Sequence, residues 1–289
     1  MKTIYFDCTN GVGGDMVSIA LKGLLGEKQS EARKEIEKFQ KHMFDFTHGH
    51  GQKLCQEHDN VSDKHNHDHS HDHHYAHAQN HVHSHDHSHD HDHSHDHDHH
   101  HTLSQDNHAH HSHDHSNSYK TIKKIIESSE LSEKAKEKAL ATYFVIAKAE
   151  AFAHETTIEE VHFHEVGRDE AVLNIVSAAI YIDLLEVESI TCSEICDGVG
   201  FIECSHGTIP VPVPAVMAMR KETELVFTTD ENVKTEMVTP SGLAMIMGLG
   251  AKYNKEIPKG EVLQKATVFG KRKTGRAGGF SAYLITCVI

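Results

Sequence analysis

The apolar positions near the N-terminus first follow the spacing of a strand and then that of a helix. Ile4-Tyr5-Phe6 is a continuous apolar run with the length of a short buried strand. Apolar residues from Met16 to Leu24 recur at helical spacing, and the charged residues 31–41 are typical of a surface helix. Residues 44–47, with phenylalanine at alternate positions, predict a second strand, and the glycines of 48–51 predict a loop after it.

Helical spacing returns after residue 121. The isoleucines of 122–126 predict a short helix, and Ser132 begins a longer one that runs to Phe152. Residues 170–185 are apolar nearly all round, which is typical of a helix packed between two layers.

The last hundred residues alternate between strands and loops. Residues 197–209 predict a bent hairpin, the prolines of 210–214 predict extended chain, and 220–237 predict a further strand region. A helix begins at Thr239-Pro240, and 281–289 predict a final strand. The pattern favours an α/β fold of layered sheet and helices, with an α+β arrangement as the alternative.

A histidine tract interrupts these elements. Of the chain's 32 histidines, 24 lie between His65 and His115, with nine aspartates and no lysine, arginine or glutamate. Because the tract has no apolar periodicity, we expect it to be disordered. The expected parts are an N-terminal strand, glycine loop and helix (1–58), a disordered metal-binding insert (59–118) and the main α/β part (119–289).

The tract presents imidazoles at every second position, which gives many overlapping sites of low specificity. Imidazole sites prefer nickel, copper and zinc over manganese or iron. Storage or capture of such ions is therefore favoured over a purely solvating linker. The weak storage sites are expected at His83, His85, His87, His89, His91, His93, His95 and His97.

Charge and composition exclude several classes of protein. The net charge of −15 comes mostly from the tract, and no basic stripe is present, so nucleic acid is not an expected partner. The six cysteines form no C-x-x-C pair and are expected to be reduced thiols. Neither a signal peptide nor an apolar run of membrane-spanning length occurs, so we expect a cytoplasmic protein without membrane contact.

The segment 161–167 is the strongest candidate for a specific metal site. In extended chain, side chains at i and i+2 point to the same face, so His162 and His164 can converge on one ion while Phe163 faces the other way. Glu165 follows at once. Imidazole nitrogen with carboxylate oxygen suits a divalent ion such as nickel or zinc. For the two histidines alone, exposed polar positions are the favoured alternative.

A second group of oxygen ligands follows on the next predicted helix. Glu170 and Asn174 are spaced i, i+4 and so lie on one helix face. His206, beside Gly207, is a further candidate ligand or acid/base, although an ordinary turn histidine is the favoured alternative when it is taken alone.

The loop 7–16, from Asp7 to Met16, joins the first strand to the first helix and is rich in glycine. Such a loop exposes backbone N–H groups beside a helix N-terminus, which is an anion-binding geometry. It lacks the Gly-Lys-Ser/Thr of a P-loop and the Gly-x-Gly-x-x-Gly of a dinucleotide site. Asp7 ends a strand, where ligands of open α/β sheets bind. Asp15 is either a helix cap or a functional carboxylate.

Two further segments can meet an anion. Thr239-Pro240-Ser241-Gly242 opens a helix with hydroxyl groups beside its first turn, so it is either a helix start or a second anion cradle. The basic residues Lys271, Arg272, Lys273 and Arg276 can meet phosphate, with a solvated loop as the favoured alternative.

Five segments together resemble the LarC family of nickel insertion proteins. They are Asp7-Cys8 through Gly14-Asp15-Met16, the internal histidine tract, residues 161–167, residues 206–212 and Thr239-Pro240-Ser241-Gly242. The segments are specific in this combination and order, and the resemblance covers essentially the whole chain.

The resemblance implies a CTP-dependent cyclometallase, a lyase of the metal chelatase type. Such a protein inserts nickel into pyridinium-3,5-bisthiocarboxylic acid mononucleotide to make the nickel-pincer cofactor of lactate racemase. It forms one nickel–carbon and two nickel–sulfur bonds while CTP is cleaved with a divalent Mg or Mn ion. Complete members continue into a C-terminal portion, encoded in part of the family as a frameshifted extension, so the resemblance implies that this chain is the N-terminal portion.

The implied partners are the pincer mononucleotide, the C-terminal portion, lactate racemase apoprotein and a second copy of the chain in a homo-oligomer. The implied site falls into three groups of residues. The candidate catalytic residues are Asp7, Asp15 and Glu165; the candidate cofactor-binding residues are Gly11, Gly13, Gly14, Thr239, Ser241 and Gly242; and the candidate nickel ligands are His162, His164, Glu165, Glu170 and His206.

Two other functions compete with nickel insertion. The first is nickel or zinc storage or delivery without catalysis, in which the folded part only anchors the tract. The second is a metal-dependent hydrolase, which is disfavoured because the chain has no H-E-x-x-H pattern and no positioned nucleophile.

Overall fold

The computed structural model describes residues 1–49, 118–163, 165–204 and 207–287. The predicted insert at 59–118 lies outside these ranges except for its last residue, so its disorder stays a prediction. The helices of the described part are α1 (Gly14–Gly23), α2 (Gln29–Gly49), α3 (Tyr119–Glu127), α4 (Glu133–Ala153), α5 (Asp169–Leu185), α6 (Pro214–Arg220) and α7 (Pro240–Gly248), with a short 3-10 turn η1 (Gly26–Lys28) before α2.

A mixed five-stranded sheet has β1 at its centre. The strands are β1 (Lys2–Asp7), β2 (Ser189–Cys192), β3 (Ile195–Asp197), β4 (Gly200–Cys204), β5 (Gly207–Val211), β6 (Phe227–Thr229), β7 (Lys252–Tyr253), β8 (Glu261–Val268) and β9 (Phe280–Thr286). The sheet order is β7-β2-β1-β9-β8, with β1 parallel to β2 and antiparallel to β9. Two separate ribbons pair β3 with β6 in parallel and β4 with β5 antiparallel.

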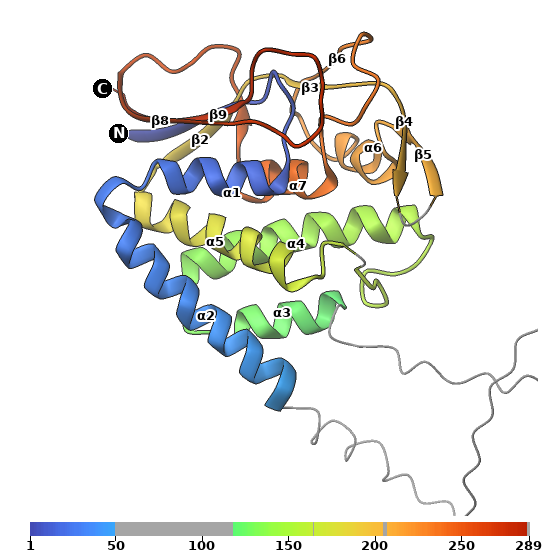
Figure 1. Ribbon diagram of the computed structural model, residues 1–289. Helices are drawn as coiled ribbons and strands as arrows, with labels where there is room; N and C mark the ends of the chain where they lie inside the picture. The colour runs from blue at the N-terminus through green and yellow to red at the C-terminus, as the bar shows by residue number, and fades with distance from the viewer. Residues whose placement is uncertain (50–117, 164, 205–206, 288–289) are drawn as a thin grey trace, which may run out of the picture. The chain divides into compact units, whose positions relative to one another are not determined.

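The helices of the described part lie in layers on one side of this sheet (Figure 1). Helices α1 and α7 lie next to the sheet, α4 and α5 follow, and α2 and α3 lie outermost. This arrangement confirms the predicted α/β class with layered sheet and helices. It also places the loop after β1 and the start of α7 on the same level of the molecule.

The best predicted elements are those with the most buried positions. Ile4, Tyr5 and Phe6 are all buried in β1, as a strand covered on both faces requires. Helix α5 buries ten of its 17 residues, which agrees with its apolar sequence and its place between α1 and α4. The hairpin of β4 and β5 lies within the predicted range 197–209 except for its last two residues.

Residues 44–47 were predicted as a strand, and that prediction is wrong. Helix α2 continues through them to Gly49, so the predicted loop at 48–51 is also wrong for its first two residues. The reason is that Phe39 and Met43, spaced i, i+4, are buried and Phe46 packs against the same core, whereas Phe44 is 59% exposed. The alternate phenylalanines therefore lie on opposite sides of a helix, with Phe46 toward the core and Phe44 toward solvent.

The strand region predicted for 220–237 is largely wrong. Arg220 ends α6, and only Phe227–Thr229 forms a strand, β6. Helix α6 begins with Pro214 in its first turn, directly after the extended proline segment. The edge strand β8 was not predicted, because most of its residues are exposed and no buried face marks its sequence.

Candidate functional site

The loop 7–16 is built by its own first residues. The carboxylate of Asp7 accepts hydrogen bonds from the Thr9 amide at 3.1 Å and from the Thr9 hydroxyl at 2.5 Å. The Gly11 amide donates to the Cys8 carbonyl at 3.0 Å, and Gly11 has φ +84°, a conformation that favours glycine. Asp7 therefore shapes the turn at the end of β1, whatever else it contacts.

Asp15 lies in the first turn of α1 and does not cap it. The N-cap position is Gly13, and no side chain bonds to the helix there. One carboxylate oxygen of Asp15 accepts from the Met16 amide at 2.9 Å, and the other lies 3.3 Å from the Lys271 ammonium group. Asp15 therefore does not occupy the N-cap position, although its carboxylate accepts from an amide of the first turn, and its functional role stays a prediction.

The two predicted anion-binding segments meet in the fold. The Val12 amide donates to the Met237 carbonyl at 2.9 Å, and the Thr239 amide donates to the Val12 carbonyl at 3.0 Å. A methyl group added at Gly14 would lie 2.7 Å from the Ser241 hydroxyl oxygen. The N-termini of α1 and α7 therefore lie side by side, which brings together Gly11, Gly13, Gly14, Thr239, Ser241 and Gly242.

The start of α7 confirms the prediction of a helix start at Thr239. The Thr239 hydroxyl caps the helix by accepting from the Gly242 amide at 3.1 Å, and Pro240 occupies the first turn. Thr239 also lies 3.2 Å, hydroxyl to hydroxyl, from Ser241. A helix start and an anion cradle are compatible interpretations, since the first turn of a helix leaves backbone N–H groups without helical partners.

A buried ion pair holds the segment before α7 in place. Asp197 is fully buried, and its carboxylate accepts from the amides of Gly198, Met237 and Val238 at 2.8, 3.0 and 3.2 Å. Arg220 donates to its other oxygen at 3.0 Å. Burial raises the pKa of Asp197, while these hydrogen bonds and the positive charge of Arg220 act in the opposite direction. Neither residue was singled out from the sequence.

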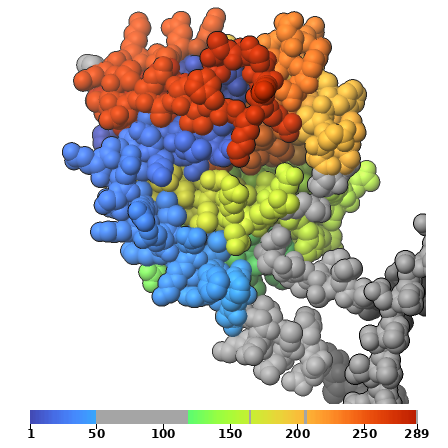
Figure 2. Space-filling view, in the orientation of Figure 1, coloured from blue at the N-terminus to red at the C-terminus, as the bar shows by residue number. Residues whose placement is uncertain are grey.

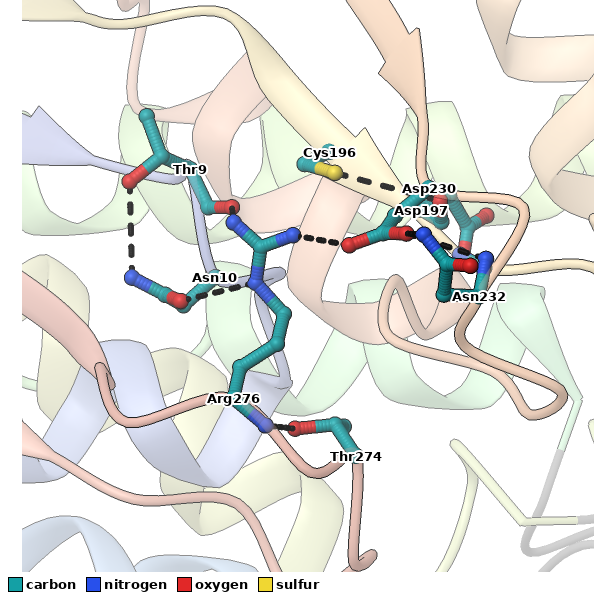
Figure 3. Close-up of polar contacts among 9 residues, drawn as sticks. Thr9, Asn10, Cys196, Asp197, Asp230, Asn232, Thr274 and Arg276 are labelled. Carbon is teal, nitrogen blue, oxygen red and sulfur yellow. Dashed lines mark hydrogen bonds and ion pairs between the residues drawn. The ribbon is translucent and has the colours of Figure 1, made fainter.

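The loop of residues 269–279 between β8 and β9, called the basic loop below, lies against the loop 7–16. Arg276 donates to the Asn10 side chain at 3.0 Å and to the Thr9 carbonyl at 3.2 Å, and it forms an ion pair with Asp230 (Figure 3). Its side chain is only 30% exposed. The favoured alternative of a solvated loop is therefore wrong for Arg276, whose hydrogen bonds hold the basic loop against the loop 7–16.

Glu236 is a further residue that the sequence analysis did not single out. Its side chain is 7% exposed and lies 3.3 Å from Arg272. Burial raises the pKa of Glu236 to about 7, and the negative charges of Asp197 and Glu165 act in the same direction, whereas Arg272 lowers it. A buried carboxyl that titrates near neutral pH is typical of functional sites. No local signal marks it, because Glu236 stands among other polar residues in a loop.

The segment 161–167 packs through its apolar residues. Phe163 is buried, with ring centroids 6.4 Å from Tyr119 and 5.9 Å from Tyr143. His162 is exposed and forms an antiparallel bridge with Ser118. His162 and Phe163 thus differ in burial as predicted, whereas the convergence of His162 and His164 on one ion stays a prediction. The Tyr143 hydroxyl donates to the Val166 carbonyl at 3.2 Å and holds the end of the segment.

The predicted nickel ligands are only partly within the described structure. Glu165 and Glu170 are exposed, and Glu170 lies in the first turn of α5. In residues 1–49, 118–163, 165–204 and 207–287, no three His, Cys, Asp or Glu side chains gather as a metal site requires. The remaining ligands and storage sites lie outside the described residues: His164, His206, His83, His85, His87, His89, His91, His93, His95 and His97. The complete ligand set therefore stays a prediction.

The cysteines within the described residues are free thiols, as predicted. Burial raises the pKa of Cys192 to about 12 and that of Cys8 well above its usual range. Both thiols are therefore protonated near neutral pH in this form.

None of the helices in the described part of the chain has the length and apolar character needed to cross a membrane.

The fold is that of an α/β protein in which the N-termini of α1 and α7 meet at the loop 7–16. The chain matches the nickel insertion protein family over residues 4–284, and it belongs to that family. This finding confirms the family resemblance found in the sequence.

Three relatives show how the chain compares with other members. The pyridinium-3,5-bisthiocarboxylic acid mononucleotide nickel insertion protein of Acetivibrio thermocellus is 44% identical over 54% of this chain and 38% of its own length. A putative nickel insertion protein of Dictyoglomus thermophilum is 31% identical over 89% of this chain and 54% of its own length. The protein of Akkermansia muciniphila with the same name as the first is 30% identical over 86% of this chain and 52% of its own length.

The chain spans about half of the length of these relatives or less. No solved structure matches it.

Proposed function

We propose that this chain takes part in the insertion of nickel into pyridinium-3,5-bisthiocarboxylic acid mononucleotide. Family membership and the names of the relatives support this reaction. The observation that carries the proposal is the meeting of two helix N-termini at Val12, because a mononucleotide carries a phosphate that needs such an anion-binding place.

In this proposal the phosphate of the mononucleotide binds at the joined N-termini of α1 and α7. Six candidate residues lie there, Gly11, Gly13, Gly14, Thr239, Ser241 and Gly242, and the amides of Gly11, Thr239 and Gly242 among them already donate within the fold and build the cradle. Glycine is required at position 242, because a methyl group there would lie 2.4 Å from the Val12 carbonyl oxygen and would separate the start of α7 from the loop 7–16. Asp15, in the first turn of α1, lies at the same place and is a candidate to orient the substrate.

Nickel is the second substrate, and we assign its positioning to the segment 161–167. The proposed ligands are His162, His164 and Glu165, with Glu170 and His206 as further candidates. Imidazole and carboxylate groups bind nickel reversibly. They can therefore pass the ion to sulfur atoms of the mononucleotide. Glu165 is among the charges that raise the pKa of Glu236, and this supports the proposal of a common site.

CTP with Mg or Mn belongs to the proposal only for the longer proteins. The loop 7–16 does not fit a triphosphate cradle, since it lacks the lysine of a P-loop. We therefore assign CTP cleavage to a C-terminal portion or frameshifted extension. Delivery of the product to lactate racemase, a cytoplasmic location and a homo-oligomer are further parts of the proposal.

A second candidate function is nickel or zinc storage or delivery without catalysis. The 24 histidines between His65 and His115 favour it, because they offer many weak sites. The two functions differ when residues 65–115 are deleted. Storage disappears with the tract, whereas a specific site and transfer to the mononucleotide remain.

The test is nickel incorporation into the purified mononucleotide precursor, followed by absorbance and mass. The chain is assayed with and without residues 65–115, and with and without CTP and a C-terminal portion from one of the longer relatives. We expect incorporation that requires both additions and survives the deletion when nickel is in excess. Nickel binding without transfer, with both additions present, would instead establish the storage or delivery function.

A further inference from the structure

The basic loop, residues 269–279, joins β8 to β9 and borders the joined N-termini of α1 and α7. On the face shown in Figure 2, its red atoms lie around blue atoms of the N-terminal segment. Two backbone positions show the contact. A methyl group added at Gly278 would lie 2.4 Å from the Asn10 side chain, and one at Gly270 would lie 3.5 Å from the Met16 sulfur. The loop is therefore in place to contact a ligand bound at the glycine loop.

The cations of the basic loop differ in how firmly they are held. Arg276 has three partners at the loop 7–16 and at Asp230, so it is a fixed structural contact. Lys271 is 87% exposed and pairs with Asp15 at the surface, which is a weak interaction. Arg272 is intermediate, with a half-exposed side chain and a buried partner, Glu236.

The ion pair between Arg272 and Glu236 joins two side chains that differ strongly in exposure. It has a single contact at 3.3 Å, and the Arg272 side chain is 46% exposed while the Glu236 side chain is 7% exposed. Burial raises the pKa of Glu236 to about 7 even though Arg272 opposes that change. Near neutral pH the carboxyl is therefore protonated for much of the time. Arg272 then lacks a charged partner and is available to another anion.

The charged groups around Glu236 favour such an exchange. The charge of Arg272 lowers the pKa of Glu236, whereas the negative charges of Asp197 and Glu165 raise it. If Arg272 moves to another anion, Glu236 loses that stabilising positive charge. It then takes up a proton from solvent and remains buried in its neutral form.

We propose that Arg272 recognises the phosphate of the mononucleotide by exchanging its contact with Glu236 for that phosphate. The inference rests on the proposed function, since it specifies how the same site holds its substrate. A guanidinium group binds phosphate with two parallel hydrogen bonds, which its single contact with Glu236 does not provide. No bond to carbon or nickel is involved, and the only chemical change is the uptake of one proton by Glu236.

The first experiment compares Arg272→Ala with Lys273→Ala. Both variants remove one positive charge from the same exposed stretch of the basic loop, so long-range attraction falls equally. The probes are inorganic phosphate and nicotinic acid mononucleotide, titrated calorimetrically at pH 8 without nickel. We expect Arg272→Ala to weaken binding by about tenfold or more and Lys273→Ala by less than about threefold. Equal losses in the two variants, or no binding of either probe by the unmodified chain, would overturn the proposal.

The second experiment removes the competing carboxylate with Glu236→Gln. Glutamine keeps the shape of the side chain but cannot form the ion pair, so Arg272 is released. We expect tighter probe binding at pH 8 than in the unmodified chain, by about threefold or more. Titration in two buffers of different ionisation enthalpy should show proton uptake by the unmodified chain and none by the variant. Unchanged proton uptake in a folded Glu236→Gln variant would overturn the exchange.

These outcomes separate the inference from the proposed function. If nickel incorporation occurs but Arg272→Ala and Lys273→Ala behave alike, only the inference fails. If Arg272→Ala alone loses binding but nickel is never transferred, the anion site stands and the insertion function fails. Thermal unfolding of each variant identifies any loss that comes from misfolding.

Discussion

The amide of Thr239 donates a hydrogen bond to the carbonyl of Val12 at 3.0 Å, which ties the start of α7 to the glycine loop before α1. A second hydrogen bond joins the same two segments, since the Val12 amide donates to the Met237 carbonyl. Two helix N-termini from opposite ends of the chain are thus held by backbone groups and not by long side chains. The stability of this contact between the loop 7–16 and the start of α7 is the first property that a substitution can test.

Gly242→Ala should weaken the contact between the start of α7 and the loop 7–16. The added methyl group would lie 2.4 Å from the Val12 carbonyl oxygen, which is backbone and cannot rotate away. We expect a loss of about 2 kcal/mol or more in the free energy of unfolding, measured with urea. The matched control is Gly49→Ala, also in a helix, where nothing lies within 4 Å. Equal stability of the two variants would show that the close approach does not persist in solution.

Asp197→Ala should be among the most destabilising single changes. It leaves Arg220, whose side chain is only 14% exposed, without its carboxylate, and it removes the acceptor for three amides. We expect a loss of about 3–5 kcal/mol in unfolding free energy. Lys148→Ala breaks the exposed ion pair with Glu222 and should cost less than about 1 kcal/mol. A loss as small for Asp197→Ala would contradict its role as an anchor of the segment before α7.

The elements predicted correctly from sequence are those whose local pattern coincides with their burial. Helix α5 is apolar nearly all round and is buried nearly all round, and β1 is a continuous apolar run at the centre of the sheet. The pattern misleads where local alternation and tertiary packing disagree. Phe44 and Phe46 alternate like a strand, but the burial of Phe39 and Met43 extends α2 through them. Edge strand β8 buries too little to leave any pattern.

The parts of the candidate site could be found from sequence, but their meeting could not. The glycine loop and Thr239-Pro240 each carry a local signal for a helix N-terminus. Their contact is long-range, and neither segment encodes the other. Glu236 has no signal at all, because its character comes from burial beside Asp197 and Arg272, which lie far from it in the chain. Sequence reasoning thus identified candidate cradles but missed the buried carboxyl.

Tyr143→Phe should loosen the segment 161–167 without disrupting the core. Tyr143 is fully buried, and its hydroxyl donates to the Val166 carbonyl at 3.2 Å. Removal of the hydroxyl leaves that acceptor without this donor, so we expect a loss of about 1 kcal/mol in unfolding free energy. Tyr253→Phe, at an exposed position, is the control and should be neutral. If the segment positions nickel, Tyr143→Phe should also lower nickel affinity in a chain lacking residues 65–115, measured by calorimetry.

Glu236 should make the stability of the chain depend on pH between 4.5 and 7. Burial raises its pKa in the folded chain from 4.5 to about 7, so the folded state holds a proton that the unfolded chain releases near pH 4.5. The stabilising contribution is fully present below pH 4.5 and is lost as pH rises through 7, by a total of about 3 kcal/mol. Glu236→Gln cannot titrate and should lack this loss. Asp197 also has a raised pKa, but it is present in both proteins and its effect largely cancels in the difference.

The measurement is urea unfolding of both proteins at several pH values from 5 to 8. We expect the unfolding free energy of Glu236→Gln, relative to the unmodified chain, to increase with pH over this range, because only the unmodified chain must ionise a buried carboxyl. Glu222→Gln, at an exposed carboxylate paired with Lys148, is the control and should give a difference that barely changes with pH. A constant difference for Glu236→Gln would mean that Arg272 keeps the carboxylate ionised throughout. The ion pair would then be too strong for a phosphate to replace.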